Sequence, residues 1–365
     1  MMQIELQDNE RAITVTRRER LLASLRLEKP DRVPMFDFLF QESMYEHLIG
    51  HKPGVYNALD AMECALALEH DGVWLPFGGF SGFEPKMLDE KTYVDEWGTT
   101  YQRNPASWPI DAPIDYPIKS RQDLAKYKAP DPTLDGRDAE IKKASANNPE
   151  DIALLGGVLG PFAATWLLMG YERICMALYD DPGILTECFK VSVEYSKEAA
   201  RRSVDAGCHG MWLSEDLGDS HSGFMSNDHF NKLVLPHIAE LAEYIDALGV
   251  PVLLHSCGCI KQYLPALAQT KIASIHPLQR TAGMDLKEIK QKYGDRFCII
   301  GNVDSSVTLP FGTVGQVIAE TKEVIEIASP GGGFILASDH SLHDGIPIEN
   351  ITALRDTGLK YGKVY

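Results

Sequence analysis

Residues 251–260 read PVLLHSCGCI, and the pattern of this stretch, an apolar run followed by polar residues and a turn, recurs along the chain. Its first half is a short apolar run, which is typical of a buried strand. The run ends in polar and sulfur-bearing side chains, and Gly258 lets the backbone turn before a helical segment begins at Lys261. His255 and Cys257 are two residues apart, so on an extended backbone both side chains point to the same side. Zinc accepts an imidazole and a thiolate as ligands. The alternative is a loop in which both groups are only structural.

Seven more apolar runs of this kind occur along the chain, and each is followed by a helical pattern or a long insertion. The eight predicted strands are Arg32–Phe38, Gly72–Phe77, Ile152–Gly156, Gly210–Ser214, Val252–His255, Ile272–Ile275, Phe297–Gly301 and Phe334–Ala337. Eight strands alternating with helices predict an α/β fold of the (β/α)8 TIM-barrel type. The runs lack polar alternation, as parallel strands buried on both faces should. A doubly wound sheet would alternate as well, but no Gly-x-Gly-x-x-Gly motif follows the first strand.

Two segments fall outside the regular alternation. A helical N-terminal extension is expected over residues 1–30, and an irregular insertion after the second strand is expected over residues 79–147, approximately. The insertion is interrupted by prolines and is too long for a plain loop, so we expect it to pack over one face of the barrel. Residues 93–101 within it are compatible with a small hairpin. The whole chain, residues 1–365, is predicted to form a single barrel domain.

Composition and charge narrow the classes of function. The chain has 365 residues and a formal net charge of −17, which argues against binding to nucleic acid or to an anionic membrane surface. No apolar run reaches the roughly 18 residues of a transmembrane helix. The first twenty residues lack the apolar core of a signal peptide. The seven cysteines are scattered as in a reduced protein, so we expect a cytoplasmic location.

Polar groups collect where the predicted strands end, which in such a barrel is where the active site lies. After the apolar runs they appear, in chain order, as Glu215 and Asp216, then His255 and Cys257, His276, Asp304, and finally Asp339 and His340. Each has a structural alternative: the carboxylates can cap helices or face solvent, and His276 can serve as a hydrogen-bonded structural group. We predict catalytic roles for the four carboxylates in this set.

Three of these side chains form a candidate metal site. His255, Cys257 and His340 supply N and S ligands from two strand ends, and the fourth position is left for a carboxylate, water or substrate, as in catalytic zinc sites. We predict Glu215 as the fourth ligand because its side chain reaches further than that of Asp216. Asp216 would then hydrogen-bond to an imidazole ligand.

The same segments resemble the uroporphyrinogen decarboxylase superfamily over nearly the whole chain. The resemblance is carried by Glu215–Gly218, His255–Gly258, Gly301–Asp304, and the segments Ile335–His340 and Pro347–Asn350. It implies a (β/α)8 barrel and one of two chemistries. One is cofactor-independent decarboxylation of a porphyrinogen, and the other is methyl transfer to or from a corrinoid, using zinc bound by a His-x-Cys pair and a later cysteine.

The chain resembles the corrinoid-dependent methyltransferase branch more than the decarboxylases. The arginine-rich loop and the Phe-Ser-Asp motif of the decarboxylases are replaced here by residues 37–43 and 77–79, respectively. A substrate with eight carboxylates needs cations, and the only basic residues near the strand-end loops are Lys86 and Arg280. His340 stands where the methyltransferases have their second cysteine, and Asp95–Gly98 is also similar to that branch. The resemblance implies Zn²⁺, a corrinoid (cobalamin) carried by a partner protein, and a small-molecule methyl donor or acceptor.

Two other functions remain open at this level. A metal-free decarboxylase would use Asp339, His340 and Tyr101. A non-catalytic barrel would bind a tetrapyrrole or a partner protein. The sequence names neither the methyl donor nor the acceptor. A set of phenylalanines near the first two strands lines either an apolar pocket or the core: Phe38, Phe40, Phe77, Phe80 and Phe83.

Overall fold

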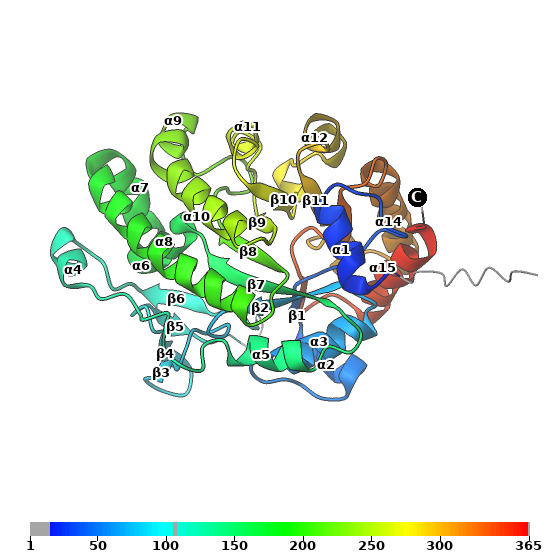
Figure 1. Ribbon diagram of the computed structural model, residues 1–365, viewed down its shortest axis with the longest axis horizontal. Coiled ribbons are helices and arrows are strands. Elements are labelled where there is room, and N and C mark those ends of the chain that lie inside the picture. Colours follow the sequence, from blue (N-terminus) through cyan, green and yellow to red (C-terminus); the bar gives the residue numbers. More distant parts are fainter. Residues whose placement is uncertain (1–14, 105–107, 364–365) are drawn as a thin grey trace, which may run out of the picture.

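The computed structural model describes residues 15–104 and 108–363. Its centre is a curled parallel sheet, which in the described part of the chain has seven strands in the order β12-β11-β10-β9-β8-β7-β2 (Figure 1). The strands are β2 (Gly72–Pro76), β7 (Ala153–Leu159), β8 (Gly210–Glu215), β9 (Val252–Ser256), β10 (Ile272–His276), β11 (Cys298–Val303) and β12 (Phe334–Ser338). Their side chains are almost all buried, as expected for a sheet covered on both faces. The predicted TIM-barrel class is confirmed.

The first predicted strand, residues 32–38, is wrong as a regular strand. Only Met35 forms a bridge, with Leu336 of β12, although backbone hydrogen bonds join this segment to Leu336 on one side and to Asp71 before β2 on the other. Pro34 has no N–H to donate to a ladder. The Asp37 carboxylate also accepts the backbone N–H of Ser338 at 2.8 Å, which replaces a strand-to-strand bond. The segment nevertheless lies between β12 and β2, at the eighth position of the barrel.

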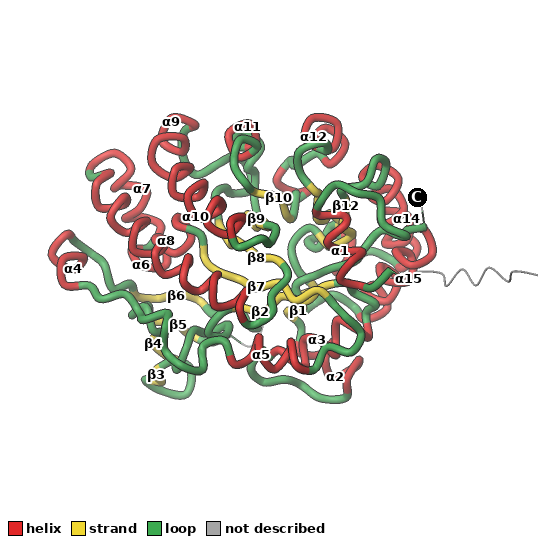
Figure 2. The backbone as a smooth tube through the Cα atoms, in the orientation of Figure 1, coloured by secondary structure: helices red, strands yellow, loops and turns green. Residues whose placement is uncertain are grey.

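Helices cover the outside of the sheet, as Figures 1 and 2 show. Before and between the first strands they are α1 (Arg17–Leu25), α2 (Glu42–Ile49), α3 (Ala58–Ala67), α4 (Arg121–Lys126) and α5 (Ala139–Ala146). After β7 come α6 (Pro161–Met169), α7 (Tyr171–Asp180) and α8 (Pro182–Asp205). After β8 come α9 (Asn227–His229), a π-helical turn (Phe230–Val234) and α10 (Leu235–Ala247). The remaining helices are α11 (Leu264–Leu267), the 3₁₀ turn Arg280–Ala282, α12 (Leu286–Tyr293), α13 (Thr308–Phe311), α14 (Val314–Ala328) and α15 (Ile348–Tyr361).

Helix α14 illustrates why these segments fold where they do. Thr313 caps its N-terminus in a reciprocal capping box with Gln316. Val317, Val324 and Ile325 recur at helical spacing and are all buried against the barrel. The apolar stripe and the cap together specify both the start of the helix and the face that packs inward.

The insertion is more regular than expected. It contains a four-stranded antiparallel sheet of β3 (Lys86–Met87), β4 (Thr92–Val94), β5 (Thr100–Gln102) and β6 (Ala112–Asp115), seen at the lower left of Figure 1. The expected hairpin is confirmed, because β4 and β5 pair antiparallel. The Thr99 hydroxyl donates to the carbonyl of Leu167 in α6 at 2.7 Å. This contact fixes the insertion against the helix that follows β7.

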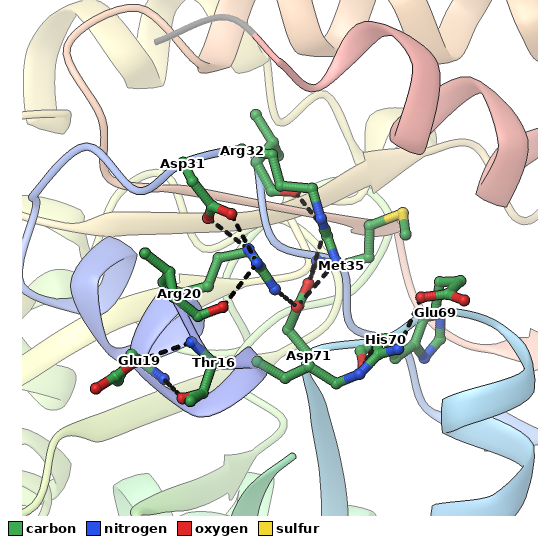
Figure 3. Close-up of polar contacts among 12 residues, drawn as sticks. Thr16, Glu19, Arg20, Asp31, Arg32, Met35, Glu69, His70 and Asp71 are labelled. Carbon is green, nitrogen blue, oxygen red and sulfur yellow. Dashed lines mark hydrogen bonds and ion pairs between the residues drawn. The ribbon is translucent and has the colours of Figure 1, made fainter. Parts of the chain in front are cut away.

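A buried cluster of ion pairs joins α1 to Asp71, the residue directly before β2 (Figure 3). Arg20 donates to Asp71 at 2.7 Å and to Asp31, and Arg32 donates to both Asp71 carboxylate oxygens at 3.0 Å. The backbone N–H of Met35 also donates to Asp71, at 2.8 Å. Asp71 is fully buried, so these donors replace the water that its carboxylate loses on folding.

Residues 1–14 of the expected N-terminal extension lie outside the described residues, and α1 is the helix within the rest of it. The single-domain assignment stays a prediction. None of the helices in the described part of the chain has the length and apolar character required to cross a membrane.

Candidate metal centre and its cavity

His255 is placed by β9 and held by a neighbouring histidine. β9 and β10 run in register, with His255 opposite His276. The two Nδ1 atoms are 2.8 Å apart, so one ring donates a hydrogen bond to the other. Burial lowers the pKa of His255 to about 3 and that of His276 well below its usual value. Both rings are therefore neutral, and the Nε2 atom of His255 is left for another ligand.

Cys257 is positioned by the turn after β9. Gly258 has a φ of +73°, and a Cβ on it would lie 2.3 Å from the carbonyl oxygen of Gly218. Glycine is required here because the loops after β8 and β9 touch backbone to backbone. Burial, followed by the charge of Asp216, raises the pKa of the Cys257 thiol. A metal ion would reverse that shift by stabilising the thiolate.

His340 follows β12 and faces the other two groups. Its Nδ1 lies 3.0 Å from the hydroxyl of Ser341, and its ring centre is 5.8 Å from that of His255. Burial lowers the pKa of His340 to about 4, so this imidazole is also neutral near pH 7. As in His255, the Nδ1 is occupied by a local partner while the Nε2 remains available.

The three candidate ligands converge on one point. One ligand atom from each of His255, Cys257 and His340 lies within 4.8 Å of the other two. Tetrahedral zinc, with bonds of about 2.0–2.3 Å, spaces its ligands by about 3.3–3.8 Å, so small side-chain rotations close the site. Two neutral imidazoles and a thiol, with the outer imidazole nitrogens already oriented, are a donor set that fits zinc.

Glu215, the predicted fourth ligand, accepts hydrogen bonds from the backbone of α6. Its two carboxylate oxygens accept the backbone N–H groups of Phe162, at 3.2 Å, and Ala163, at 2.7 Å, in the first turn of α6. A Cβ on Gly160 would collide with this carboxylate at 2.3 Å, so glycine makes room for it. Burial raises the pKa of Glu215 to about 8. Its role as the fourth ligand stays a prediction, and its observed contacts join β8 to α6.

Asp216 is the carboxylate beside the thiol. The Sγ of Cys257 lies 3.5 Å from its Oδ1. Burial raises the pKa of Asp216, and the hydrogen bond from Cys257 opposes that shift. The end of β8 therefore directs one carboxylate into the helix terminus and the next toward the candidate metal centre.

The other two predicted catalytic carboxylates, Asp304 and Asp339, accept hydrogen bonds from nearby loop residues. Asp304 accepts the backbone N–H groups of Ser306 and Val307, at 2.7 and 2.8 Å, and so closes a turn after β11. Asp339 is buried and accepts hydrogen bonds from Ser305 and from the backbone N–H of Arg280. Neither lines the cavity described next. Their catalytic roles stay predictions, while their observed contacts stabilise loops.

A cavity of about 510 Å³ opens at the candidate metal centre. His255, Cys257 and His340 line one part of it, and residues of the insertion, including Asp95 and Tyr101, line another. Its volume is in the usual range for small-molecule sites. Four of the five phenylalanines considered from the sequence also line it, namely Phe38, Phe40, Phe77 and Phe80.

The described cavity wall carries acidic groups without basic ones, although Glu96 is paired with Arg137 behind the wall and burial raises the pKa of Glu215 to about 8. Among the described residues, the wall includes no lysine or arginine. Its carboxylates are Asp95, Glu96, Asp111, Glu215 and Asp216. Lys86 lies exposed on β3, and Arg280 is paired with Glu320 at 2.8 Å, so neither basic residue noted in the sequence lines the cavity.

Sequence reasoning gave no role at the site to two residues. Trp74 of β2 lines the cavity. The one signal for this in the sequence was that Trp74 lies in a predicted strand of the barrel. His276 was noted at a strand end, but its contact with His255 depends on the register of two strands that the sequence does not specify.

The fold and the site together define a barrel enzyme class with a candidate His/Cys metal centre at the carboxyl ends of its strands. The family model of uroporphyrinogen decarboxylase (URO-D) matches residues 110–361, which is more than half of the chain. The chain belongs to the uroporphyrinogen decarboxylase family, as the sequence resemblance predicted.

Curated relatives fall into two groups of activity. A methylcobamide:CoM methyltransferase of Methanosarcina barkeri is 24% identical over 204 residues, covering 56% of this chain and 57% of the relative. A uroporphyrinogen decarboxylase of Anaeromyxobacter dehalogenans is 25% identical over 260 residues, covering 68% and 71%, respectively. The chain thus spans little more than half the length of the methyltransferase that it matches. The chain is therefore similar to enzymes of two activities, and the nearly equal identities do not distinguish between these activities for this chain.

A solved structure supports the fold. A methyltransferase from Methanosarcina mazei aligns over 95% of this chain and 99% of its own length, with a TM-score of 0.76 and 22% identity. This likeness shows that the two chains share the same barrel architecture.

Proposed function

We propose that this chain is a zinc-dependent methyltransferase that moves a methyl group between a small molecule and a corrinoid carried by a partner protein. The observation that carries the proposal is the convergence of His255, Cys257 and His340, with ligand atoms within 4.8 Å of one another, beside a cavity of about 510 Å³. A structural zinc site would have four protein ligands. Three, with the cavity at the remaining side, are the arrangement of a catalytic site.

The chain's own residues would have distinct tasks. His255, Cys257 and His340 would hold the ion, His276 and Ser341 would orient the two imidazoles, and Asp216 would lie next to the thiolate. When bound, zinc supplies Lewis acidity toward a heteroatom of the methyl compound. The apolar cavity wall would exclude water, which strengthens the electrostatic interactions inside.

The chemistry of the cavity wall disfavours the alternative decarboxylase. A porphyrinogen with eight carboxylates requires cationic partners, and the described wall carries carboxylates without any lysine or arginine. Bringing further negative charge into such a site is unfavourable. Some of the relatives are named methylcobamide:CoM methyltransferases. Because a methylcobamide is a methylated corrinoid, this similarity supports a corrinoid as the second substrate.

A methyl-transfer assay tests the proposal. Purified, zinc-loaded protein is mixed with a corrinoid protein in the reduced Co(I) state and a panel of methyl ethers, methylamines and methyl thioethers. We expect the visible spectrum to change from Co(I) to methyl-Co(III) with at least one donor, and His255→Ala with Cys257→Ala to abolish the change. Loss of carboxylates from added uroporphyrinogen, without any methyl transfer, would support the decarboxylase instead.

A further inference from the structure

One segment at the end of β10 contacts each of the three candidate metal ligands or the residue next to it. This β10-end segment, residues 276–280, begins with His276, whose Nδ1 lies 2.8 Å from that of His255. It continues to Gln279 and Arg280, which contact the turns that carry the other two ligands. The ligands follow β9 and β12, and β10 lies between these strands in the sheet, so one segment can reach both turns.

Gln279 holds the turn that carries Cys257. The backbone N–H of Gly258, the residue after this candidate ligand, donates to the Oε1 of Gln279 at 2.9 Å. On the other side of the turn, the backbone N–H of Cys259 donates to the carbonyl of Asp219 at 2.7 Å. The Cys257 turn is therefore fixed from the β8 side by backbone and from the β10 side by the side chain of Gln279.

The backbone N–H of Arg280 holds the turn that carries His340, and it does so through Asp339. Asp339 is fully buried, and its Oδ2 accepts this N–H at 3.0 Å. Its Oδ1 accepts both the N–H and the hydroxyl of Ser305, each at 2.7 Å. A buried carboxylate requires such donors, because it has lost its water. The residue directly before His340 is thus fixed by three hydrogen bonds.

The backbone of the β10-end segment is itself strained. Leu278 has a φ of +56°, in the left-handed region that is costly for any residue other than glycine. The buried side-chain amide of Asn302 in β11 donates to the carbonyl of Leu278 at 2.9 Å and supports this conformation. Strain of this kind persists only where surrounding contacts over-determine the backbone, and it clusters at functional sites. Here it sets the direction in which the next two residues leave β10.

The spacing of the ligands shows why their turns have to be held. The three ligand atoms lie within 4.8 Å of one another, whereas tetrahedral zinc spaces its ligands by about 3.3–3.8 Å. Bond lengths to zinc tolerate deviations of only about 0.2 Å, so the two turns must be kept close to their final separation.

We infer that the β10-end segment, through Gln279 and the backbone of Arg280, positions Cys257 and His340 at the separation that a metal ion requires. The inference rests on the zinc centre of the proposed function and extends it to side chains that do not touch the ion. Gln279 acts on the thiolate, and Asp339 acts on the imidazole of His340. Both are positioning residues, since each acts through a neighbouring ligand.

Substitutions of Gln279 in the full-length protein test the thiolate side. Gln279→Leu removes the acceptor of the Gly258 N–H, so we expect zinc affinity, measured by competitive chelator titration, to fall about tenfold. In the Co²⁺-loaded variant the thiolate-to-cobalt charge-transfer band should shift or weaken, because this band reports the geometry of the Cys257 sulfur at the ion. Gln279→Glu keeps an acceptor and should stay within about threefold of the wild-type affinity.

Gln262→Leu is the matched control for Gln279→Leu. Gln262 is also partly buried, and its side chain donates to the carbonyl of Met225 at 2.8 Å, in the loop after β8. Because this bond does not involve a ligand turn, zinc affinity and the cobalt band should match those of the wild type. Equal losses of zinc affinity in the two leucine variants would overturn the inference. Wild-type affinity with an unchanged band in Gln279→Leu, or a Gln279→Glu variant as weak as Gln279→Leu, would also overturn it.

Asp339→Asn tests the imidazole side. An amide NH₂ cannot accept the Arg280 N–H, so we expect zinc affinity about tenfold lower, with the thiolate-to-cobalt band unshifted because the Cys257 turn is untouched. Ser305→Ala, its control, removes one donor to Asp339 but leaves the Arg280 contact, and should keep zinc affinity within about twofold of wild type. Equal losses in both variants would contradict the role of Asp339. The Gln279 series decides the inference even if Asp339→Asn does not fold, because Gln279 is only partly buried.

The zinc content of the wild-type protein separates this inference from the proposed function. A wild-type protein that holds no zinc overturns both. Zinc in the wild type, together with wild-type behaviour of Gln279→Leu, overturns only the positioning role. If the wild type binds zinc but transfers no methyl group, the proposed function fails, while weaker zinc binding and an altered cobalt band in Gln279→Leu still support the positioning role.

Discussion

The Nδ1 of His255 lies 2.8 Å from the Nδ1 of His276; the His276 ring is buried and the His255 ring is partly buried. Only one proton can occupy this contact when both imidazoles are neutral. For the Nε2 of His255 to bind a metal ion, its Nδ1 must carry that proton and donate it to His276. His276 would thus act as a positioning residue that fixes the tautomer of a ligand it touches.

We predict that His276→Phe lowers zinc affinity about 10- to 100-fold, because loss of an orienting partner has that size of effect on metal sites. Competitive chelator titration measures the affinity. His276→Gln, which can still accept the hydrogen bond, should retain more affinity than His276→Phe. His51→Gln, on an exposed side chain, is the control and should match wild type. Equal affinity in His276→Phe and wild type would contradict the positioning role.

The two carboxylates at the end of β8 should respond differently to amide substitution. Asp216→Asn replaces the group beside the Cys257 thiol, so we expect it to weaken zinc binding more than Glu215→Gln does. Glu215→Gln should instead destabilise the fold by about 1–3 kcal/mol, because an amide NH₂ cannot accept an N–H of α6. Chelator titration and urea unfolding of both variants measure the two effects. Greater loss of zinc affinity in Glu215→Gln would instead support Glu215 as the fourth ligand.

Asp71 lies directly before β2, and we expect its carboxylate to make a large contribution to the free energy of unfolding. Asp71→Ala leaves the side chains of Arg20 and Arg32, each about one-tenth exposed, without their shared buried partner. We expect a loss of about 3–5 kcal/mol in the free energy of unfolding, measured with urea. Asp31 is the other carboxylate partner of Arg20, and its side chain is 43% exposed. Asp31→Ala should therefore lower the free energy of unfolding by less than about 1 kcal/mol. Similar losses in both variants would argue against a special role for the buried carboxylate.

Much of the fold could be predicted from the sequence because buried parallel strands are continuous apolar runs. Seven of these runs appear as strands of the sheet in the described chain, with boundaries shifted by a few residues. The first run failed because Pro34 lacks an N–H and the Asp37 side chain takes a strand partner's N–H, and neither effect is visible in an apolar pattern. In the insertion only the β4–β5 hairpin was predicted, because the other two strands, β3 and β6, are short and largely exposed.

The candidate site was predictable only in part. His255 and Cys257 could be paired from local spacing, and His340 from its position after a strand. The contacts of Glu215 and Asp216 could not be predicted. Adjacent residues at the end of a strand point in different directions, and which of them faces the cavity depends on the turn that follows. Asp304 was also ambiguous, because an aspartate that closes a turn and a catalytic aspartate occupy the same position in a sequence.

Metal analysis of the purified protein tests the central claim most directly. The wild-type chain should contain about one zinc ion, and replacement by Co²⁺ should give a thiolate-to-cobalt charge-transfer band. His255→Ala with Cys257→Ala should lose both the zinc and the band while keeping the circular dichroism spectrum of the folded barrel. An unchanged zinc content in that double variant, with the fold intact, would contradict the assignment of the metal centre.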